Sequence, residues 1–245
     1  MKLGLRDYFM GLVCYICVGM ELTEFEIKGR RCVYRADQQP EVLLVEALDA
    51  RELEGLDAEL SAIKEGCTQR FAYVALIVED WNKDLAPWTA APVFGKVPFG
   101  DGARNTLEII ETGVIPEMLS RFGSLIGADI IIGGYSLAGL FALWCCYESD
   151  LFQGVAAASP SVWYPDWMKF IGSHNPNAKR IYLSLGDAEA KTKNETMATV
   201  EQNIRAMSDM IKELPGVEST LVFNLGGHFK DPFLRTAHAF IWAVG

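Results

Sequence analysis

A serine in a glycine-rich turn between two apolar segments is well placed to do chemistry. The run is Ile130-Ile131-Ile132-Gly133-Gly134-Tyr135-Ser136-Leu137-Ala138-Gly139. A sharp strand-to-helix turn presents a serine hydroxyl as a nucleophile when the residues two before and two after it are small. Gly134 and Ala138 meet this condition, although the spacing is G-x-S-x-x-G instead of G-x-S-x-G. The setting favours Ser136 as a nucleophile, and the alternative is a capping serine in an ordinary turn.

A serine nucleophile needs a base, and the chain has three histidines. His228 follows a predicted strand (220–225) through Gly226-Gly227 and precedes the last predicted helix. In the chain order Ser, acid, His, this is where an α/β hydrolase has its base. His174 precedes a predicted strand and His238 lies inside a predicted helix. His228 is therefore the predicted base.

The orienting acid is expected between the serine and the histidine. Asp187 and Glu189 both follow a predicted strand (180–185), and the residues themselves leave the choice between them open. An oxyanion also requires backbone N–H donors. The first is expected from Leu137, directly after the nucleophile, and the second from the loop after strand 73–78, near Trp81 or Asn82.

Three segments together resemble the esterase family of α/β hydrolases that includes siderophore (enterochelin-type) esterases, feruloyl esterases, S-formylglutathione hydrolase and mycolyltransferases. They are the run from Gly133 to Leu143, Ser159-Pro160-Ser161-Val162-Trp163, and Gly227-His228-Phe229. The resemblance covers the chain from about Tyr73 to the C-terminus.

That resemblance implies a small-molecule ester substrate, cleaved through an acyl-enzyme on Ser136 with His228 as base. It implies no metal and no organic cofactor. The family's acid often lies three residues after a glycine that closes the penultimate strand, which favours Glu189 and leaves Asp187 as second choice. Some relatives work as a Ser–His dyad.

The least regular stretch (80–102) is a long loop, and such loops are usually functional. Its Trp81 and Trp88, with Tyr135, Trp163 and Trp167, are expected to line an apolar or aromatic substrate pocket. Core packing is the alternative for each tryptophan.

Apolar periodicity alternates between strands and helices. Strands are predicted over 25–34, 42–46, 73–78, 129–132, 154–158, 180–185 and 220–225. Helices are predicted over 52–65, from Asn105 with a break at Pro116, over 137–147, from Met197 to Leu214, and after Asp231-Pro232. This alternation predicts a mostly parallel central sheet with helices on both faces, a three-layer α/β/α sandwich. With the resemblance, the expected class is the α/β-hydrolase fold.

The chain has 245 residues, of which 50% are hydrophobic, and a formal net charge of −10. This composition predicts a single domain over 1–245. No Lys- and Arg-rich run provides the clustered charge that nucleic-acid binding needs.

Among the six cysteines, Cys14-x-x-Cys17 lacks a second pair or a histidine that would complete a zinc site. Reduced thiols in a cytoplasmic protein are expected.

The first twenty residues are unusual, since Lys2 and Arg6 precede an apolar run over 8–20. The run is too short to cross a bilayer, and no A-x-A-like cleavage site follows. An uncleaved extension or a start-site artefact is favoured over a signal peptide, and no membrane partner is expected. A homo-oligomer stays open.

Two other functions compete with ester hydrolysis. An acyltransferase would use the same acyl-enzyme and differ only in its acceptor. A non-catalytic binding module on a hydrolase fold is the other alternative, and the presence of both Ser136 and His228 argues against it.

Overall fold

The computed structural model describes residues 21–245. The predicted N-terminal extension and the Cys14-x-x-Cys17 pair lie outside the described residues. The four cysteines within them are free thiols, and three of these are buried. Among residues 21–245, no helix combines the length and the apolar character needed to cross a membrane.

The strands of residues 21–245 form one eight-stranded sheet in the order β1-β2-β4-β3-β5-β6-β7-β8. The pairs β1–β2 and β2–β4 are antiparallel, and every pair from β4 through β3 to β8 is parallel. The strands are β1 (Thr23–Ile27), β2 (Arg30–Ala36), β3 (Val42–Leu48), β4 (Phe71–Ile77), β5 (Asp129–Tyr135), β6 (Gly154–Ala158), β7 (Arg180–Gly186) and β8 (Glu218–Asn224).

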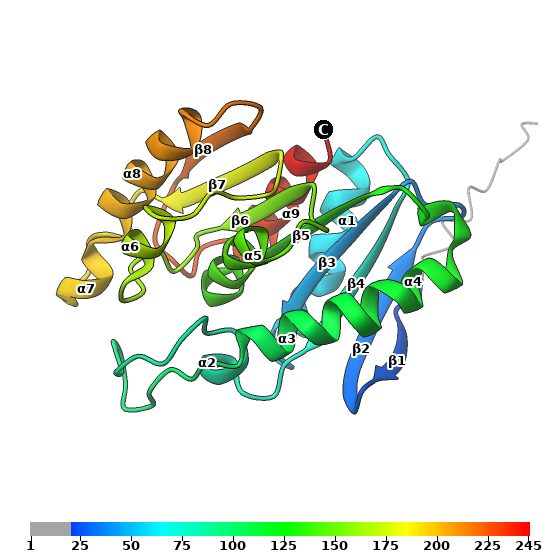
Figure 1. Cartoon of the computed structure of the whole chain (residues 1–245), viewed down its shortest axis with the longest axis horizontal. Helices are drawn as coiled ribbons and strands as arrows, with labels where there is room; N and C mark the ends of the chain where they lie inside the picture. Colours follow the sequence, from blue (N-terminus) through cyan, green and yellow to red (C-terminus); the bar gives the residue numbers. More distant parts are fainter. Residues whose placement is uncertain (1–20) are drawn as a thin grey trace, which may run out of the picture.

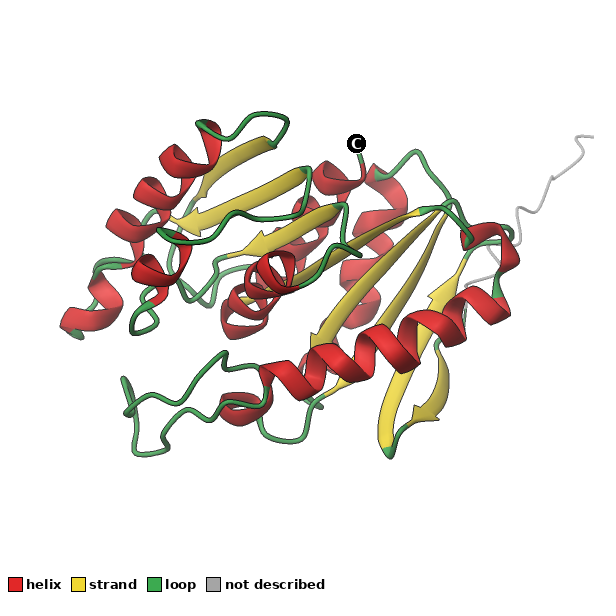
Figure 2. Cartoon of the chain, in the orientation of Figure 1, coloured by secondary structure: helices red, strands yellow, loops and turns green. Residues whose placement is uncertain are grey.

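Helices cover both faces of this sheet (Figures 1 and 2). Strands β3 and β4 are buried at every residue, as expected for parallel strands covered on both sides. On one face lie α1 (Leu56–Gly66) and α9 (Pro232–Val244). On the other lie α3 (Ala103–Ile109), α4 (Ile115–Arg121), α5 (Ser136–Glu148), α6 (Trp167–Ile171) and α8 (Val200–Lys212). The predicted mostly parallel, three-layer α/β/α arrangement is confirmed.

The shorter helical segments belong to the connections between these elements. They are η1 (Glu52–Gly55), α2 (Trp81–Asp84), η2 (Ile110–Val114), η3 (Gly123–Leu125) and α7 (Glu195–Ala198).

The first predicted strand is wrong, because residues 25–34 form a hairpin instead. β1 and β2 are joined at Lys28 and Gly29, whose φ angles are +51° and +75°. Two successive positive φ angles suit the tight turn of a two-residue hairpin. Lys-Gly is a weaker turn signal than Asn-Gly, so the sequence pattern predicts one continuous strand over 25–34.

The start of one predicted helix, the break within it and the cap of the last helix differ in detail from the sequence prediction. The helix expected at Asn105 begins at Ala103, and no side chain caps it. The break expected at Pro116 takes the form of the π-helical segment η2, which joins α3 to α4 just before the proline. Asp231 does precede α9, but it has a φ of +53° and its side chain caps nothing.

Candidate active site

Ser136 lies at the sharp turn where β5 ends and α5 begins. Its φ is +57°, a left-handed value that costs energy for any residue with a side chain. A Cβ added at Gly134 would lie 2.8 Å from the Cβ of Ala138, so both positions must be small, as the sequence predicts. At the displaced Gly139, a Cβ would meet the Gly134 carbonyl oxygen at 2.9 Å. The G-x-S-x-x-G spacing is therefore compatible with the strained turn at Ser136.

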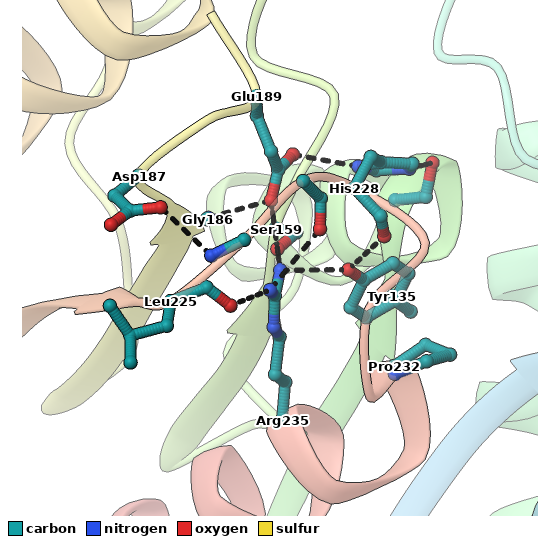
Figure 3. Close-up of polar contacts among 12 residues, drawn as sticks. Tyr135, Ser159, Gly186, Asp187, Glu189, Leu225, His228, Pro232 and Arg235 are labelled. Atoms are coloured by element: carbon teal, nitrogen blue, oxygen red, sulfur yellow. Dashed lines mark hydrogen bonds and ion pairs between the residues drawn. The ribbon is translucent and has the colours of Figure 1, made fainter.

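The hydroxyl of Ser136 begins a chain of hydrogen bonds through His228 to Glu189. The Nε2 of His228 lies 2.9 Å from the Ser136 Oγ, and its Nδ1 lies 2.7 Å from the Glu189 Oε2. His228 comes from the β8–α9 loop, and Glu189 from the turn after β7 (Figure 3). His174 stacks on Phe170, and His238 is exposed on α9. Of the three histidines, His228 is the one that reaches Ser136.

Glu189 is buried, with its side chain only 4% exposed, and several donors surround it. Its Oε1 accepts from the Gly186 N–H at 2.6 Å, the Ser159 hydroxyl at 2.8 Å and Arg235 Nη1 at 3.0 Å. Burial by itself would raise the pKa of Glu189. The hydrogen bond and charge of His228, together with hydrogen bonds from the Gly186 N–H and the Ser159 hydroxyl, hold this pKa below the ordinary 4.5. The group is therefore a carboxylate at neutral pH.

Asp187, the other candidate acid, does not contact His228. Its Oδ1 accepts a hydrogen bond of 2.8 Å from the Gly226 N–H, at the start of the loop that carries His228 (Figure 3). Of the two carboxylates left open by the sequence, Glu189 is the one oriented toward the imidazole. Asp187 instead ties the β7 turn to the β8–α9 loop.

Arg235 on α9 joins Glu189 to the loop that carries His228, and the sequence analysis does not identify it. It is 3% exposed, and Nη1 donates to Glu189, to the Tyr135 hydroxyl and to the Ser159 hydroxyl, the latter two at 3.2 Å. Nη2 donates to the carbonyls of Leu225 and Gly227, also at 3.2 Å. Asp231, four residues earlier, makes an ordinary surface ion pair the simpler expectation from sequence.

The hydroxyl face of the site opens into a cavity of about 1310 Å³. The three residues predicted to supply oxyanion donors, Leu137, Trp81 and Asn82, all line it. Each lies in the first turn of a helix, α5 or α2, where a backbone N–H has no carbonyl one turn earlier to bond. These three amides therefore have no acceptor within their own helix.

The aromatic predictions divide into two groups. Trp163 and Tyr135 line the cavity, and the Tyr135 hydroxyl also donates to the His228 carbonyl at 2.6 Å. The sequence also predicts Trp88 and Trp167 in the pocket, but both lie outside its lining. The Trp88 Nε1 donates to the Pro165 carbonyl, and the Trp88 ring packs against Trp167, which is fully buried. The loop over 80–102 turns this indole into the core because doing so completes an aromatic cluster. The same loop lines the cavity with Phe94, Val97 and Phe99.

Comparison with known proteins bears on the fold. No protein-family model and no curated protein sequence matches the chain. An IroE-like serine hydrolase from Shewanella oneidensis superposes with a TM-score of 0.74 at 14% identity, covering 90% of this chain and 79% of that one. Siderophore hydrolase EstB from Aspergillus nidulans gives 0.70 at 16% identity, covering 91% and 95%.

Enterochelin esterase from Shigella flexneri gives a TM-score of 0.59 at 16% identity, covering 91% of this chain and 58% of that one. At such identities the likeness establishes architecture. The chain has the α/β-hydrolase fold that the sequence predicts, and the family resemblance is confirmed at the level of the fold.

Proposed function

We propose that this chain is a serine hydrolase that cleaves carboxylic esters through an acyl-enzyme on Ser136. The observation that carries the proposal is the hydrogen-bonded chain from Ser136 Oγ through His228 to Glu189, with the serine held at a φ of +57°. A nucleophile bonded to a base, which is in turn bonded to an acid, is the arrangement that activates a serine hydroxyl.

In this mechanism, Ser136 Oγ attacks the ester carbonyl while His228 Nε2 takes its proton. Nε2 then donates that proton to the departing alcohol, which leaves the acyl group on Ser136. A water molecule, deprotonated by the same nitrogen, releases the acid and restores the serine. Glu189 accepts a hydrogen bond from His228 Nδ1, so that Nε2 faces Ser136 as the basic nitrogen.

The carbonyl oxygen becomes an anion during each attack, and the backbone N–H groups of Leu137 and of Trp81 or Asn82 are its proposed donors. Their position at helix starts on the cavity wall supports this role. Loss of one such donor typically costs about 10²–10³ in rate.

Arg235 is proposed to position the acid, since it touches Glu189 and the carbonyls of the His228 loop. Glu189 therefore has the same charged partner in every step of the cycle. The exposed apolar side chains of Phe94, Val97 and Phe229 on the cavity wall favour an ester with an apolar or aromatic portion. The fold's occurrence in siderophore hydrolases and an enterochelin esterase is consistent with ester chemistry.

The test is a panel of p-nitrophenyl esters, from acetate to decanoate, assayed with the wild type and three variants. Ser136→Ala and His228→Ala should each lose at least ~10³-fold in kcat. His238→Ala is the control, because that imidazole is exposed on α9. Equal losses in the two histidine variants would mean that His228 is not the base.

Product analysis with an added alcohol separates hydrolysis from acyl transfer, because both reactions share the acyl-enzyme. The free acid should be the main product. A mostly transferred acyl group would overturn the assignment to hydrolysis and leave the Ser136 chemistry intact.

A further inference from the structure

The segment Ser159-Pro160-Ser161 carries two buried serines whose hydroxyl groups have very different partners. Both residues are 1% exposed. The Ser159 hydroxyl donates to Glu189 Oε1 at 2.8 Å and accepts from Arg235 Nη1 at 3.2 Å. The Ser161 hydroxyl has one partner within residues 21–245, the Oγ of Ser136 at 3.4 Å. The first serine therefore supports the acid, whereas the second lies against the nucleophile.

The contact between Ser161 and Ser136 is too long to satisfy a buried hydroxyl group. Hydrogen bonds between hydroxyl oxygens are usually about 2.5–3.0 Å long. The Ser161 O–H group is thus a buried donor without a strong acceptor, which native structures rarely leave. Ser161 lines the cavity together with Ser136 and His228. An oxygen atom of a bound substrate can therefore supply the missing acceptor.

Backbone contacts fix Ser161 in this place. Its N–H donates to the Ser136 carbonyl at 3.0 Å, and its carbonyl accepts from the Tyr164 N–H at 2.9 Å. At Ser159, φ is +44°, a left-handed value that costs energy for a residue with a side chain. The Ser161 hydroxyl is therefore held beside the nucleophile by a strained turn that is bonded to the backbone of Ser136 itself.

The order of the strands puts Ser161 and the proposed oxyanion donors on opposite sides of Ser136. Ser136 follows β5, whose neighbours in the sheet are β3 and β6 (Figure 1). Ser161 follows β6, whereas Trp81 and Asn82 follow β4, which lies beyond β3. His228 comes from the loop after β8, which lies on the β6 side. Ser161 and His228 therefore reach the nucleophile from the same side.

The two oxygen atoms of an ester group use these two sides differently. The carbonyl oxygen becomes the anion and faces the backbone donors. The alkoxy oxygen takes the proton of His228 Nε2 as the C–O bond breaks, so it must lie close to that nitrogen and to the Ser136 Oγ. A hydroxyl group 3.4 Å from the Ser136 Oγ, on the side of His228, is within reach of this second oxygen.

We propose that Ser161 is a catalytic residue whose hydroxyl donates a hydrogen bond to the alkoxy oxygen of the ester as that oxygen leaves. This inference rests on the proposed function and adds a residue to it. The electron pair of the breaking C–O bond moves to the alkoxy oxygen, and the proton that neutralises this oxygen comes from His228 Nε2. Ser161 keeps its own proton throughout. A hydrogen bond becomes stronger as negative charge grows on its acceptor, so this contact favours the transition state over the bound ester.

The proposed role of Ser161 also defines which esters benefit from it. A leaving group that spreads its negative charge, such as p-nitrophenoxide, gains little from a donor at its oxygen. A leaving group that keeps the charge on its oxygen gains most, because that oxygen is the stronger acceptor. The structure thus points to esters of ordinary alcohols and unactivated phenols as the substrate class.

The experiment measures kcat/KM for aryl esters that share the acyl group most readily cleaved in the p-nitrophenyl panel. The leaving groups are p-nitrophenol, p-chlorophenol, phenol and p-methoxyphenol, which are similar in size and give increasingly basic phenoxides. Ser161→Ala should lose roughly 10–100-fold for the phenyl and p-methoxyphenyl esters, the effect of one hydrogen bond to a charged oxygen. The loss should be smaller for the p-nitrophenyl ester, so kcat/KM should fall more steeply with leaving-group basicity than in the wild type.

Two controls separate this role from a loss of structure. Ser208→Ala removes another buried serine hydroxyl, on α8 and outside the cavity lining, and should leave the dependence on the leaving group unchanged. Ser161→Ala should still be labelled on Ser136 by a fluorophosphonate probe, because fluoride is a weakly basic leaving group. An unlabelled Ser161→Ala would overturn the proposal by showing that the substitution disrupts the nucleophile itself.

The aryl ester series also distinguishes the two proposals from each other. An equal loss for every leaving group would overturn the role of Ser161, because a structural or oxyanion role affects all the esters alike. An unchanged kcat/KM would overturn it as well. In both cases, hydrolysis by the wild type would leave the esterase proposal standing. A wild type that hydrolyses none of the esters would contradict the esterase proposal and, with it, the role of Ser161.

Discussion

Two groups of buried carboxyl side chains border the same cavity, and they are satisfied in opposite ways. Glu189 has a guanidinium, an imidazole, a hydroxyl and a backbone N–H as donors, and its pKa lies below 4.5. Glu46 and Glu59 share a hydrogen bond with each other, and Glu46 also accepts one from the Tyr73 hydroxyl, but no cation among the described residues pairs with either. Burial raises the pKa of both. Burial is similar, so the difference lies in the partners.

That difference separates two uses of a buried carboxyl group. A carboxylate whose partners all come from the protein is fixed in charge and orientation, which suits the acid of a catalytic chain. A buried carboxyl pair that has only each other and a hydroxyl as partners is held in the neutral form instead, because no cation compensates for the lost solvation of its charge.

The largest effect should come from neutralising the satisfied carboxylate. Glu189→Gln keeps the shape of the side chain but lets it donate to His228 Nδ1, which favours the wrong tautomer. We expect kcat for ester hydrolysis to fall by roughly 10⁴-fold. Asp187→Asn is the matched control and should change kcat far less, because Asp187 contacts Gly226 and not His228. A loss below tenfold in Glu189→Gln would instead indicate that a Ser–His dyad suffices.

Removing the cation that holds Glu189 should be the next largest effect. Arg235→Met leaves a buried carboxylate with one charged partner fewer, and breaking a buried ion pair in this way costs about 3–5 kcal/mol. Arg70→Met is the control, because its pair with Glu41 is half exposed and should contribute less than about 1 kcal/mol. Urea unfolding of both variants measures the difference, and similar losses would show that Arg235 is not the central contact.

Glu189 on one side, and Glu46 with Glu52 on the other, should give opposite slopes when the free energy of unfolding is plotted against pH. For Glu189, with its lowered native pKa, the contribution is present above 4.5 and is lost as the pH falls below that value. For Glu46 and Glu52 the native state holds protons that the unfolded chain has released. Their contribution is present below 4.5 and is lost as the pH rises to about 7 and 8.

Urea unfolding from pH 3 to 9 measures both slopes. Glu59→Gln should flatten the decline between pH 5 and 8, and Glu189→Gln should flatten only the acid side. A variant that changed the opposite limb would show that the two sites had been assigned the wrong way round.

The smallest effect concerns Glu59 in the buried pair that it forms with Glu46. At pH 8, Glu59→Gln should raise the stability by ~1 kcal/mol, or about 2–4 °C in Tm, because a neutral amide replaces a buried ionisable group. Glu65→Gln should leave Tm unchanged, since that side chain is exposed. A lower Tm in Glu59→Gln would show that the hydrogen bond of the Glu59 carboxyl group to Glu46 stabilises the fold by more than its burial costs. Differential scanning calorimetry provides both values.

The sequence predicts the parts of the site that depend on local patterns. Ser136 and His228 follow from a strand-to-helix turn and from chain order, and the apolar runs of β3 to β8 predict the layered sheet. The residues alone do not decide between Asp187 and Glu189, because their orientation depends on the turn after β7, and only the family resemblance favours Glu189. Arg235, and the meeting of Glu46 with Glu59, arise from packing between elements far apart in the chain, which periodicity does not encode. The prediction that Trp88 lines the pocket is wrong for the same reason, because its position depends on packing against residues distant in the chain.

The central claim is that Ser136 is the activated nucleophile, and labelling by a fluorophosphonate probe tests it most directly. Intact-mass measurement should show one covalent adduct per chain, and peptide mapping should place it on Ser136. The Ser136→Ala variant should take up no label, and His228→Ala should react far more slowly. An unlabelled wild type, or labelling that survives Ser136→Ala, would contradict the account.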